Sequence, residues 1–287
     1  MRPMMRRLLL DAPRLKRRDV WEFRHTGTNS IDVRFDFLAG NTATVHWGDG
    51  SAPEAMTSGV NSSHTYTDAG PHTIRVVCRD EAVTYISASV ASLSGPLFAL
   101  KYSPRLTYAN FHTNQLTGSI PDLSGNPALQ TFSVSANQLT GSIPDLSGNP
   151  ALQTFYANTN QLTGSIPDLS GNPALQTFSV HTNQLTGSIP DLSGNPALLT
   201  FTAHINQLTG YEGGLQVMRT MTNFRADDCK LTVDAVNQIL IDLDTARVAG
   251  NPVCTANLGG GTNAAPTGDG ITAKNNLLAA EWPVTTN

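Results

Sequence analysis

Hydrophobic residues recur at fixed positions through the middle of this 287-residue chain, in a pattern that repeats every 23 residues. The 19-residue string NQLTGSIPDLSGNPALQTF starts at Asn114, Asn137 and Asn160 without a change, and again at Asn183 with Leu199 in place of Gln. Within one period the apolar positions are Leu129, Phe132, Val134, Leu139, Ile143 and Leu146. Such a short period indicates a solenoid, in which each repeat is one coil that buries its apolar side chains against the next.

The residues around Phe132 alternate between apolar and polar, which predicts a β-strand in every coil. Phe132 and Val134 should point inward, and Ser133 and Ser135 outward, because successive strand side chains lie on opposite faces. Stacked coils would then form a parallel sheet with strands about 4.8 Å apart. The Asn that begins each string can satisfy backbone groups where the chain leaves the strand. Repetition predicts a ladder formed by Asn114, Asn137, Asn160, Asn183 and Asn206.

Less perfect copies extend this frame in both directions. Residues 106–116 fit one step upstream, and residues 221–231 fit downstream with Cys229 in the Asn position. The spacing L-x-x-L-x-L-x-x-N-x-L resembles that of leucine-rich repeats, in which Cys can replace the Asn. The LTGSIP stretch resembles the plant-type class of these repeats, which also occurs in bacterial and viral proteins. The resemblance implies about six coils between Leu106 and Leu231.

Residues 19–90 contain short alternating runs separated by turn residues, a pattern typical of a β-sandwich. The segments VHWGDGS (Val45–Ser51) and HTYTDAGPHTIRV (His64–Val76) resemble the polycystic-kidney-disease (PKD) type of immunoglobulin-like module. In that module the WGDG segment makes a tight turn after one strand. We expect Asp49 to accept hydrogen bonds from amides of its own loop, with a cation site as the alternative.

Beyond Leu231 the apolar residues change to helical spacing. Thr232 can cap a helix whose apolar face comprises Val233, Val236, Ile239, Leu240 and Leu243. This helix would cover the end of the last coil. The tail then predicts a strand, a Gly-rich loop, a second short helix and a final strand over Trp282–Thr286.

The predicted fold class is therefore mixed β and α/β, with four parts. A basic arm (1–18) precedes a PKD/immunoglobulin-like β-sandwich (19–90). A leucine-rich-repeat solenoid with a parallel sheet (91–231) follows, and a C-terminal α/β cap (232–287) ends the chain.

Charge is distributed unevenly around the formal net value of −4. Residues 1–18 carry seven cations against Asp11 alone, giving +6, while the remainder has eleven cations and twenty-one acids, giving −10. Such an arm stays solvated or docks on an acidic partner. Its apolar run Leu8–Leu10 is too short for an export signal or a membrane span. The residues assigned to this anchor are Arg2, Arg6, Arg7, Arg14, Lys16, Arg17 and Arg18.

Sequence differences among the copies are confined to the four-residue windows SVSA, YANT, SVHT and TAHI, apart from Leu199. The first outward column comprises Asn110, Ser133, Tyr156, Ser179, Thr202 and Arg225. The second comprises His112, Ser135, Asn158, His181, His204 and Asp227. A third comprises Thr113, Ala136, Thr159, Thr182, Ile205 and Asp228. Varied positions on a fixed scaffold indicate a binding surface, and the alternative is that solvent-facing residues are simply free to vary.

Other columns suggest chemistry that we weigh against local structure. His181, His204 and Asp227 on neighbouring strands could hold a zinc-like ion or serve a hydrolase. Stacked Asp122, Asp145, Asp168 and Asp191 would repel one another, so each should accept amides of its own turn, with bound Ca²⁺ as the alternative. Rows of Thr140 and Ser142 hydroxyls leave ice binding as a further alternative.

The sequence as a whole predicts a non-enzymatic binding or structural protein, with no catalytic residue, metal or cofactor, no nucleic-acid partner and no membrane insertion. The combination of modules resembles bacteriophage virion accessory proteins, such as tail fibres, tail-tip attachments or capsid decorations. Because no export signal is visible, we expect a virion protein assembled in the host cytoplasm. Its arm and immunoglobulin-like module would contact other virion proteins, and its solenoid a host glycan or protein. A bacterial surface or secreted adhesin is the alternative, and a homo-oligomer stays open.

Overall fold

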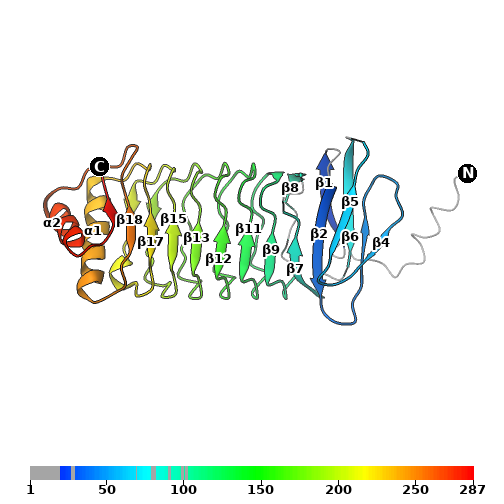
Figure 1. Ribbon diagram of the computed structural model, residues 1–287, viewed down its shortest axis with the longest axis horizontal. Helices are drawn as coiled ribbons and strands as arrows, with labels where there is room; N and C mark the ends of the chain where they lie inside the picture. The colour runs from blue at the N-terminus through cyan, green and yellow to red at the C-terminus, as the bar shows by residue number, and fades with distance from the viewer. Residues whose placement is uncertain are drawn as a thin grey trace, which may run out of the picture.

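The computed structural model describes residues 20–26, 30–68, 70–78, 82–89, 92–97, 100 and 103–287. Stacked coils form its long axis, with antiparallel sheets at one end and two helices at the other (Figure 1). The basic arm and its seven anchor residues lie outside the described residues, so their predicted docking stays a prediction.

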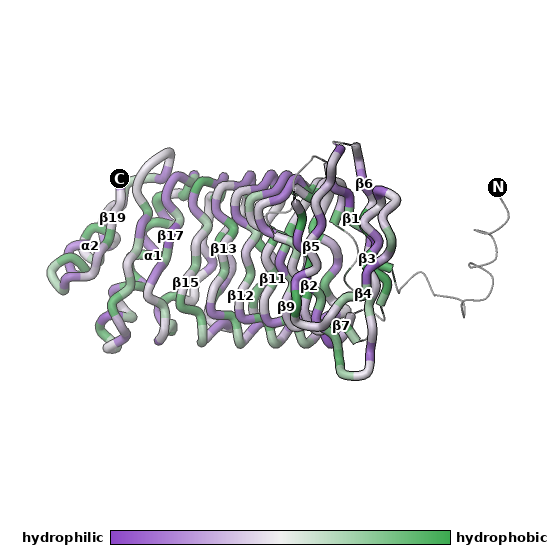
Figure 2. The backbone as a smooth tube through the Cα atoms, turned by 45° about the vertical axis from the view of Figure 1, so that its right-hand side comes forward, coloured by the Kyte–Doolittle hydropathy of each residue, from purple (hydrophilic) through white to green (hydrophobic). Residues whose placement is uncertain are grey.

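The 23-residue repeats form a β-solenoid in which each coil contributes one short strand to a parallel sheet. The strands pair in register, so that Phe132 lies beside Phe155, and Phe155 beside Phe178. Hydrophilic and hydrophobic segments alternate around the coils (Figure 2). The strands are β9 (Tyr108–Asn110), β11 (Thr131–Ser133), β12 (Thr154–Tyr156), β13 (Thr177–Ser179), β15 (Thr200–Thr202) and β17 (Asn223–Arg225).

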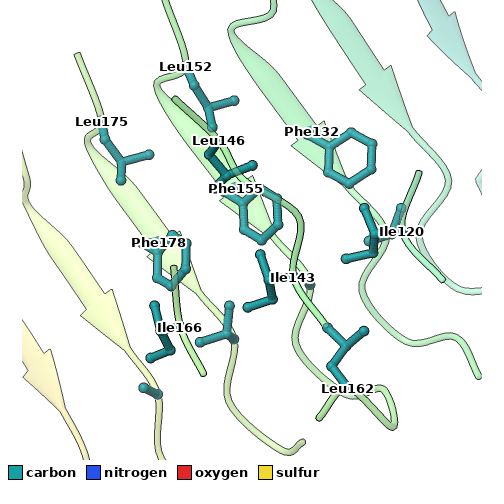
Figure 3. Packing of buried hydrophobic residues seen from close by; sticks show 14 of the residues in the cluster. Ile120, Phe132, Ile143, Leu146, Leu152, Phe155, Leu162, Ile166, Leu175 and Phe178 are labelled. Carbon is teal, nitrogen blue, oxygen red and sulfur yellow. The ribbon is translucent and has the colours of Figure 1, made fainter. Parts of the chain in front are cut away.

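A column of phenylalanines forms the centre of the solenoid core (Figure 3). The ring centroids of Phe132, Phe155 and Phe178 are 5.7 and 5.3 Å apart along the stack, and all three side chains are fully buried. Leucine and isoleucine layers, including Ile143 and Leu146, complete the interior. Burying one such side chain contributes about 1.5–3 kcal/mol, and each ring pair adds about 0.5–1.5 kcal/mol. The apolar positions of the repeat are therefore the inward positions, as predicted.

The predicted asparagine ladder is confirmed. The side-chain amide of Asn160 donates to the carbonyls of Val134 and Ala157, at 2.9 and 3.2 Å. Its oxygen accepts the amide of Leu139 in the preceding coil, at 3.0 Å. Each ladder residue thus binds backbone groups of its own coil and of its neighbour. In the coil that contains Cys229, the Leu231 amide makes the equivalent bond by donating to the side-chain oxygen of Asn263.

A second asparagine ladder, which the sequence analysis missed, lies in the SGNPAL segments. Asn149 is fully buried, and its amide donates to the carbonyls of Leu123 and Asn126 at 2.8 and 2.9 Å. The coils approach closely here, because a Cβ atom added to Gly148 would lie 2.8 Å from Cα of Ser124. The ladder residues are Asn126, Asn149, Asn172 and Asn195.

The aspartate column is held by local turns, as predicted. Asp145 accepts the amide and the hydroxyl of Ser147 at 2.8 and 2.9 Å, and Asp168 binds Ser170 in the same way. These bonds lower the pKa of Asp168. Each carboxylate is therefore stabilised within its own turn despite the neighbouring charges.

Two packed sheets form the N-terminal region. Trp21 and Phe23 of β1 (Val20–Thr26) pack edge-on against Phe35 of β2 (Ser30–Phe37), with ring centroids 5.6 and 6.4 Å apart. The Asp49 turn forms as predicted, since Asp49 accepts the Ser51 amide at 3.0 Å. One sheet has the order β10-β8-β1-β6-β3-β4, comprising β10 (Gln115–Thr117), β8 (Leu93–Pro96), β1 (Val20–Thr26), β6 (Pro71–Val77), β3 (Ala43–His46) and β4 (Glu54–Met56).

The other N-terminal sheet is continuous with the solenoid. It runs β5 (Asn61–Thr65), β2 (Ser30–Phe37) and β7 (Val83–Ser87), and β7 pairs in parallel with β9 of the first coil. Phe23 also lies 6.3 Å from Phe111, ring to ring. The N-terminal sheets therefore cover the apolar end of the first coil, and both sheets extend across the predicted boundary at residues 90 and 91.

The C-terminal segment continues the solenoid sheet. Helix α1 (Val233–Val248) leads to β18 (Thr255–Asn257), which pairs with β17, and α2 (Gly268–Ala279) leads to β19 (Val284–Thr285), which pairs with β18. The predicted covering helix is thus the connection of one further coil, and α2 connects another. The Thr232 hydroxyl caps α1 by accepting the Ala235 amide, at 3.3 Å.

One residue of the predicted helical face is not part of it. Val233 is 36% exposed because it lies in the first turn of α1, whereas Val236, Ile239, Leu240 and Leu243 are buried. No helix among the described residues has the length and apolar character needed to cross a membrane. The remaining short elements are β14 (Ser188–Ile189), β16 (Gly210–Tyr211) and the 3-10 helix η3 (Leu215–Val217).

The ladder gives a stability prediction. Asn160→Ala should lower the free energy of unfolding by about 3 kcal/mol, because it leaves buried backbone groups without partners. The neighbouring exposed residue provides the control, and Gln161→Ala should change stability by less than about 0.5 kcal/mol. Urea denaturation followed by circular dichroism measures both. Equal stability of the two variants would contradict a structural role for the ladder.

Candidate binding face

The outward side chains of the solenoid strands form one surface, here named the strand face. The strand face also includes the residue two positions after the last residue of each strand. Its first column is fixed by strand register, because Ser133 pairs with Tyr156 and Tyr156 pairs with Ser179. Asn110, Thr202 and Arg225 continue this column. All first-column residues named from the sequence therefore lie side by side.

The second column follows directly after the strands. Its alignment is held by backbone bonds between coils, since the Thr159 amide donates to the His181 carbonyl and the Thr182 amide to the His204 carbonyl, both at 2.9 Å. The structure thus brings the predicted residues together on one wall, and their role in binding stays a prediction. The column comprises His112, Ser135, Asn158, His181, His204 and Asp227.

The predicted residues differ in accessibility. Two large side chains of the first column are accessible, since Tyr156 is 36% exposed and Arg225 is partly exposed. Other members of the two columns are covered by their neighbours, with exposed fractions of 8% or less. These covered residues are Ser133, Ser179, Thr202, His204 and Asp227.

The third predicted column does not continue the strand. These residues adopt left-handed backbone angles, with φ between 49° and 57°, and so form the turn that precedes each ladder asparagine. For residues with a Cβ atom this conformation costs about 1–2 kcal/mol, which the ladder hydrogen bonds offset. The turn residues are Thr113, Ala136, Thr159, Thr182, Ile205 and Asp228.

A hollow of about 360 Å³ lies in the N-terminal half of the strand face. Its floor is β11, because Ser133 and Ser135 are short, whereas the same columns carry larger side chains on β9 and β12. Tyr156 stands on the C-terminal side of the hollow. The full lining is Tyr108, Asn110, His112, Thr131, Ser133, Ser135, Tyr156 and Asn158.

Tyr108 and Thr131 are lining residues that the sequence analysis did not single out. Tyr85 of β7 stacks on the Tyr108 ring, with centroids 4.4 Å apart and planes 2° from parallel. Arg34 lies 4.6 Å above the Tyr85 ring and is held by Asp36 at 2.9 Å. The upstream extension of the repeat frame places Tyr108 in the position of Thr131, so the frame itself could have identified it.

The C-terminal half of the strand face is filled rather than hollow. His181 and His204 stack with ring centroids 4.3 Å apart. Burial lowers the pKa of His204 to about 4, with Arg225 and His181 adding to the effect, and burial likewise lowers the pKa of His181. Arg225 binds both carboxylate oxygens of Asp227, at 3.0 and 2.7 Å.

This geometry does not favour the metal or hydrolase alternative. The Asp227 carboxylate is engaged by a bidentate guanidinium, the strongest type of ion pair geometry. Within the described part of the chain, no three His, Cys, Asp or Glu side chains form a group that could hold a metal ion. The His181, His204 and Asp227 column is therefore a packed row of polar side chains.

Comparisons with known proteins find partial structural similarities. No family model and no curated protein matches the chain. The structure of PEPR1-AtPEP1 resembles it at 25% identity and a TM-score of 0.49, over 59% of this chain and 23% of that one. The GASSHO1/SCHENGEN3 ectodomain from Arabidopsis thaliana, in complex with CASPARIAN STRIP INTEGRITY FACTOR 2, gives 19% and 0.48, over 58% and 20%. The functional domain of InlJ from Listeria monocytogenes gives 18% and 0.41, over 64% and 42%.

These structures are leucine-rich-repeat proteins, and the chain spans less than half the length of each. The PKD/immunoglobulin-like and virion resemblances are not shown by any of them and stay predictions.

The buried histidine gives a pH prediction. An unfolded histidine has a pKa of about 6.5, so between pH 6.5 and 4 the unfolded chain binds a proton at His204 that the folded chain does not. The free energy of unfolding should therefore fall as the pH is lowered through this window. His204→Asn, which introduces the residue found at position 158 of the same column, should remove part of this fall.

Denaturation at pH 7 and pH 4.5 tests this expectation for both proteins. The stability of the variant relative to the wild type should rise at the lower pH. Parallel stability curves for the two proteins would show that His204 does not titrate differently on folding.

Proposed function

We propose that this chain is a non-enzymatic binding protein that uses its strand face as the contact surface. The proposal rests on the positions at which the sequences of the copies differ. Four nearly identical coils vary in the strand-face window, and the fold aligns these variable positions on one wall. Such an arrangement separates a constant scaffold from a surface that differs from coil to coil.

Free variation of exposed residues explains the pattern less well. Ser119, Ser142 and Ser165 are exposed on the opposite side of the coils, yet the residue is the same in each copy. Asp145 has a structural reason to be constant, because it closes its own turn. The exposed serines are more accessible to solvent than much of the strand face, yet they show no variation.

The accessible strand-face side chains suit recognition of a surface-displayed partner. Tyr156 offers a ring and a hydroxyl, and His112 and Asn158 offer hydrogen-bonding groups beside it. Arg225 is partly exposed although it is held by Asp227. Binding of a macromolecule needs no catalytic group.

The N-terminal sheets have a supporting role in this proposal. We assign them to a PKD/immunoglobulin-like module that caps the solenoid and holds it at its site of attachment. The C-terminal segment closes the other end of the solenoid.

Two biological settings fit a binding solenoid, and we place a surface or secreted adhesin first. The virion setting depends on docking of the basic arm, which lies outside the described residues. The adhesin setting depends on the strand face alone. In either setting the partner is a protein or glycan on a host surface, and self-association of the chain is an additional proposal.

Cell binding by matched variants tests the strand face. A strand-face variant combines His112→Ser, Tyr156→Ser and His181→Ser, because serine already occurs in each of these columns. Flow cytometry of the labelled protein on bacterial, plant and animal cells should show binding to at least one cell type. The variant should weaken that binding by about tenfold or more, since aromatic side chains dominate interface energies.

The control variant changes the opposite side of the same coils, with Ser119→Ala, Ser142→Ala and Ser165→Ala. It should bind within about twofold of the wild type, because surface changes away from an interface are nearly neutral. Circular dichroism verifies that both variants fold. Absence of binding to every cell type, or equal losses in the two variants, would contradict the proposal.

A further inference from the structure

We propose that the hollow between β9 and β12 binds one unit of an uncharged oligosaccharide. This inference rests on the proposed function, because it assigns a ligand class to part of the strand face. It is carried by the shape of the hollow, by its hydrogen-bonding groups and by the charge of its lining.

The shape of the hollow follows from side-chain size on three adjacent strands. Among the coils from β9 to β17, all within the described range 103–287, β11 alone has serine in both columns. Its neighbours carry Asn110 and His112 on one side and Tyr156 and Asn158 on the other. The walls are two strand spacings apart, about 9.6 Å between backbones. A volume of about 360 Å³ is within the range of small-molecule sites.

One of the two aromatic groups of the hollow is held in place by the fold. Tyr108 is fixed because Tyr85 stacks on its ring and the Asn110 amide donates to its hydroxyl at 3.2 Å. Tyr156 stands above β12 with 36% of its surface exposed. A sugar ring combines a C–H face, which packs on an aromatic ring, with hydroxyls around its edge. Fixed tyrosines lose little conformational entropy when they bind such a ring.

The remaining lining groups are short donors and acceptors. Thr131, Ser133 and Ser135 supply hydroxyls on the floor, and a hydroxyl can both donate and accept. Asn158 supplies an amide from the β12 side. The Asn110 oxygen accepts the His112 amide at 3.1 Å, which fixes the orientation of that wall. A ligand with many hydroxyls matches this set, because each of its groups also donates and accepts.

The charge of the lining separates a neutral saccharide from other ligands. None of the eight lining residues carries a carboxylate, an ammonium or a guanidinium group. A positively charged ligand would therefore lose hydration without gaining an ion pair, and a sulfated one would meet no ammonium or guanidinium group. A peptide is the competing ligand, because apolar anchor side chains can also pack on the tyrosine rings of the lining.

Binding of defined oligosaccharides to the full chain tests the inference. The neutral probes are cellohexaose, chitohexaose and mannohexaose, and the competing probes are a heparin hexasaccharide and an uncharged capped hexapeptide. Saturation-transfer NMR should detect at least one neutral probe, and calorimetry should give its affinity. Ser133→Tyr fills the floor with the residue that the same column carries at position 156, and should abolish binding.

Further variants separate the contact from general effects on folding. Tyr156→Ser should weaken binding by about tenfold, and Tyr156→Phe should retain it within about threefold, because the ring makes the contact. Ser142→Ala, on the opposite side, should bind like the wild type. Failure of all three neutral probes to bind would overturn the inference. Binding unaffected by Ser133→Tyr, or a preference for the heparin probe or the peptide, would overturn it equally.

The two proposals fail in different ways. If the strand-face variant loses cell binding while no neutral saccharide binds, the saccharide assignment is wrong and the strand-face proposal stands. If a neutral saccharide binds at the hollow while cell binding does not depend on the strand face, the proposed function is wrong.

Discussion

The structure depends on hydrogen bonds that asparagine side chains make between successive coils. A solenoid must turn sharply after each short strand, and the turn buries backbone groups that have no partner within the strand. Each such group would cost about 1–3 kcal/mol if it stayed unpaired. The side-chain amide of Asn160 donates to the Val134 carbonyl, and its oxygen accepts the Leu139 amide of the preceding coil. The preceding residue, Thr159, adopts a left-handed conformation at this turn. Phenylalanine stacking then fills an interior whose outline these turns define.

Much of this could be predicted from the sequence, because the repeat places chemically identical residues at identical intervals. The inward Phe132, the Asn137 ladder and the Asp145 turn all follow from local chemistry repeated along one axis. The β7–β9 pairing could not be predicted in the same way. Tyr85 belongs to a different pattern, and no local signal indicates which strand edge meets the first coil.

The candidate site shows the same division. Register alone placed the variable residues on one wall, so the columns could be predicted from the 23-residue step. Accessibility depends on the sizes of neighbouring side chains, so Ser133 is covered while Tyr156 is not. The hollow is likewise a property of three strands together. Buried Asn149 was missed because an SGNP segment reads as an exposed turn, whereas stacking of coils encloses its amide.

Two backbone connections join the N-terminal sheets to the first coil. β7 pairs with β9 on one side, and β8 pairs with β10 on the other, so hydrogen bonds cross the junction in both sheets. A hinge at this point would have to break both sets together. Whatever fixes the orientation of the N-terminal sheets therefore also sets the direction in which Tyr156 faces. Strand pairing therefore joins the described N-terminal sheets and the solenoid into one continuous structure.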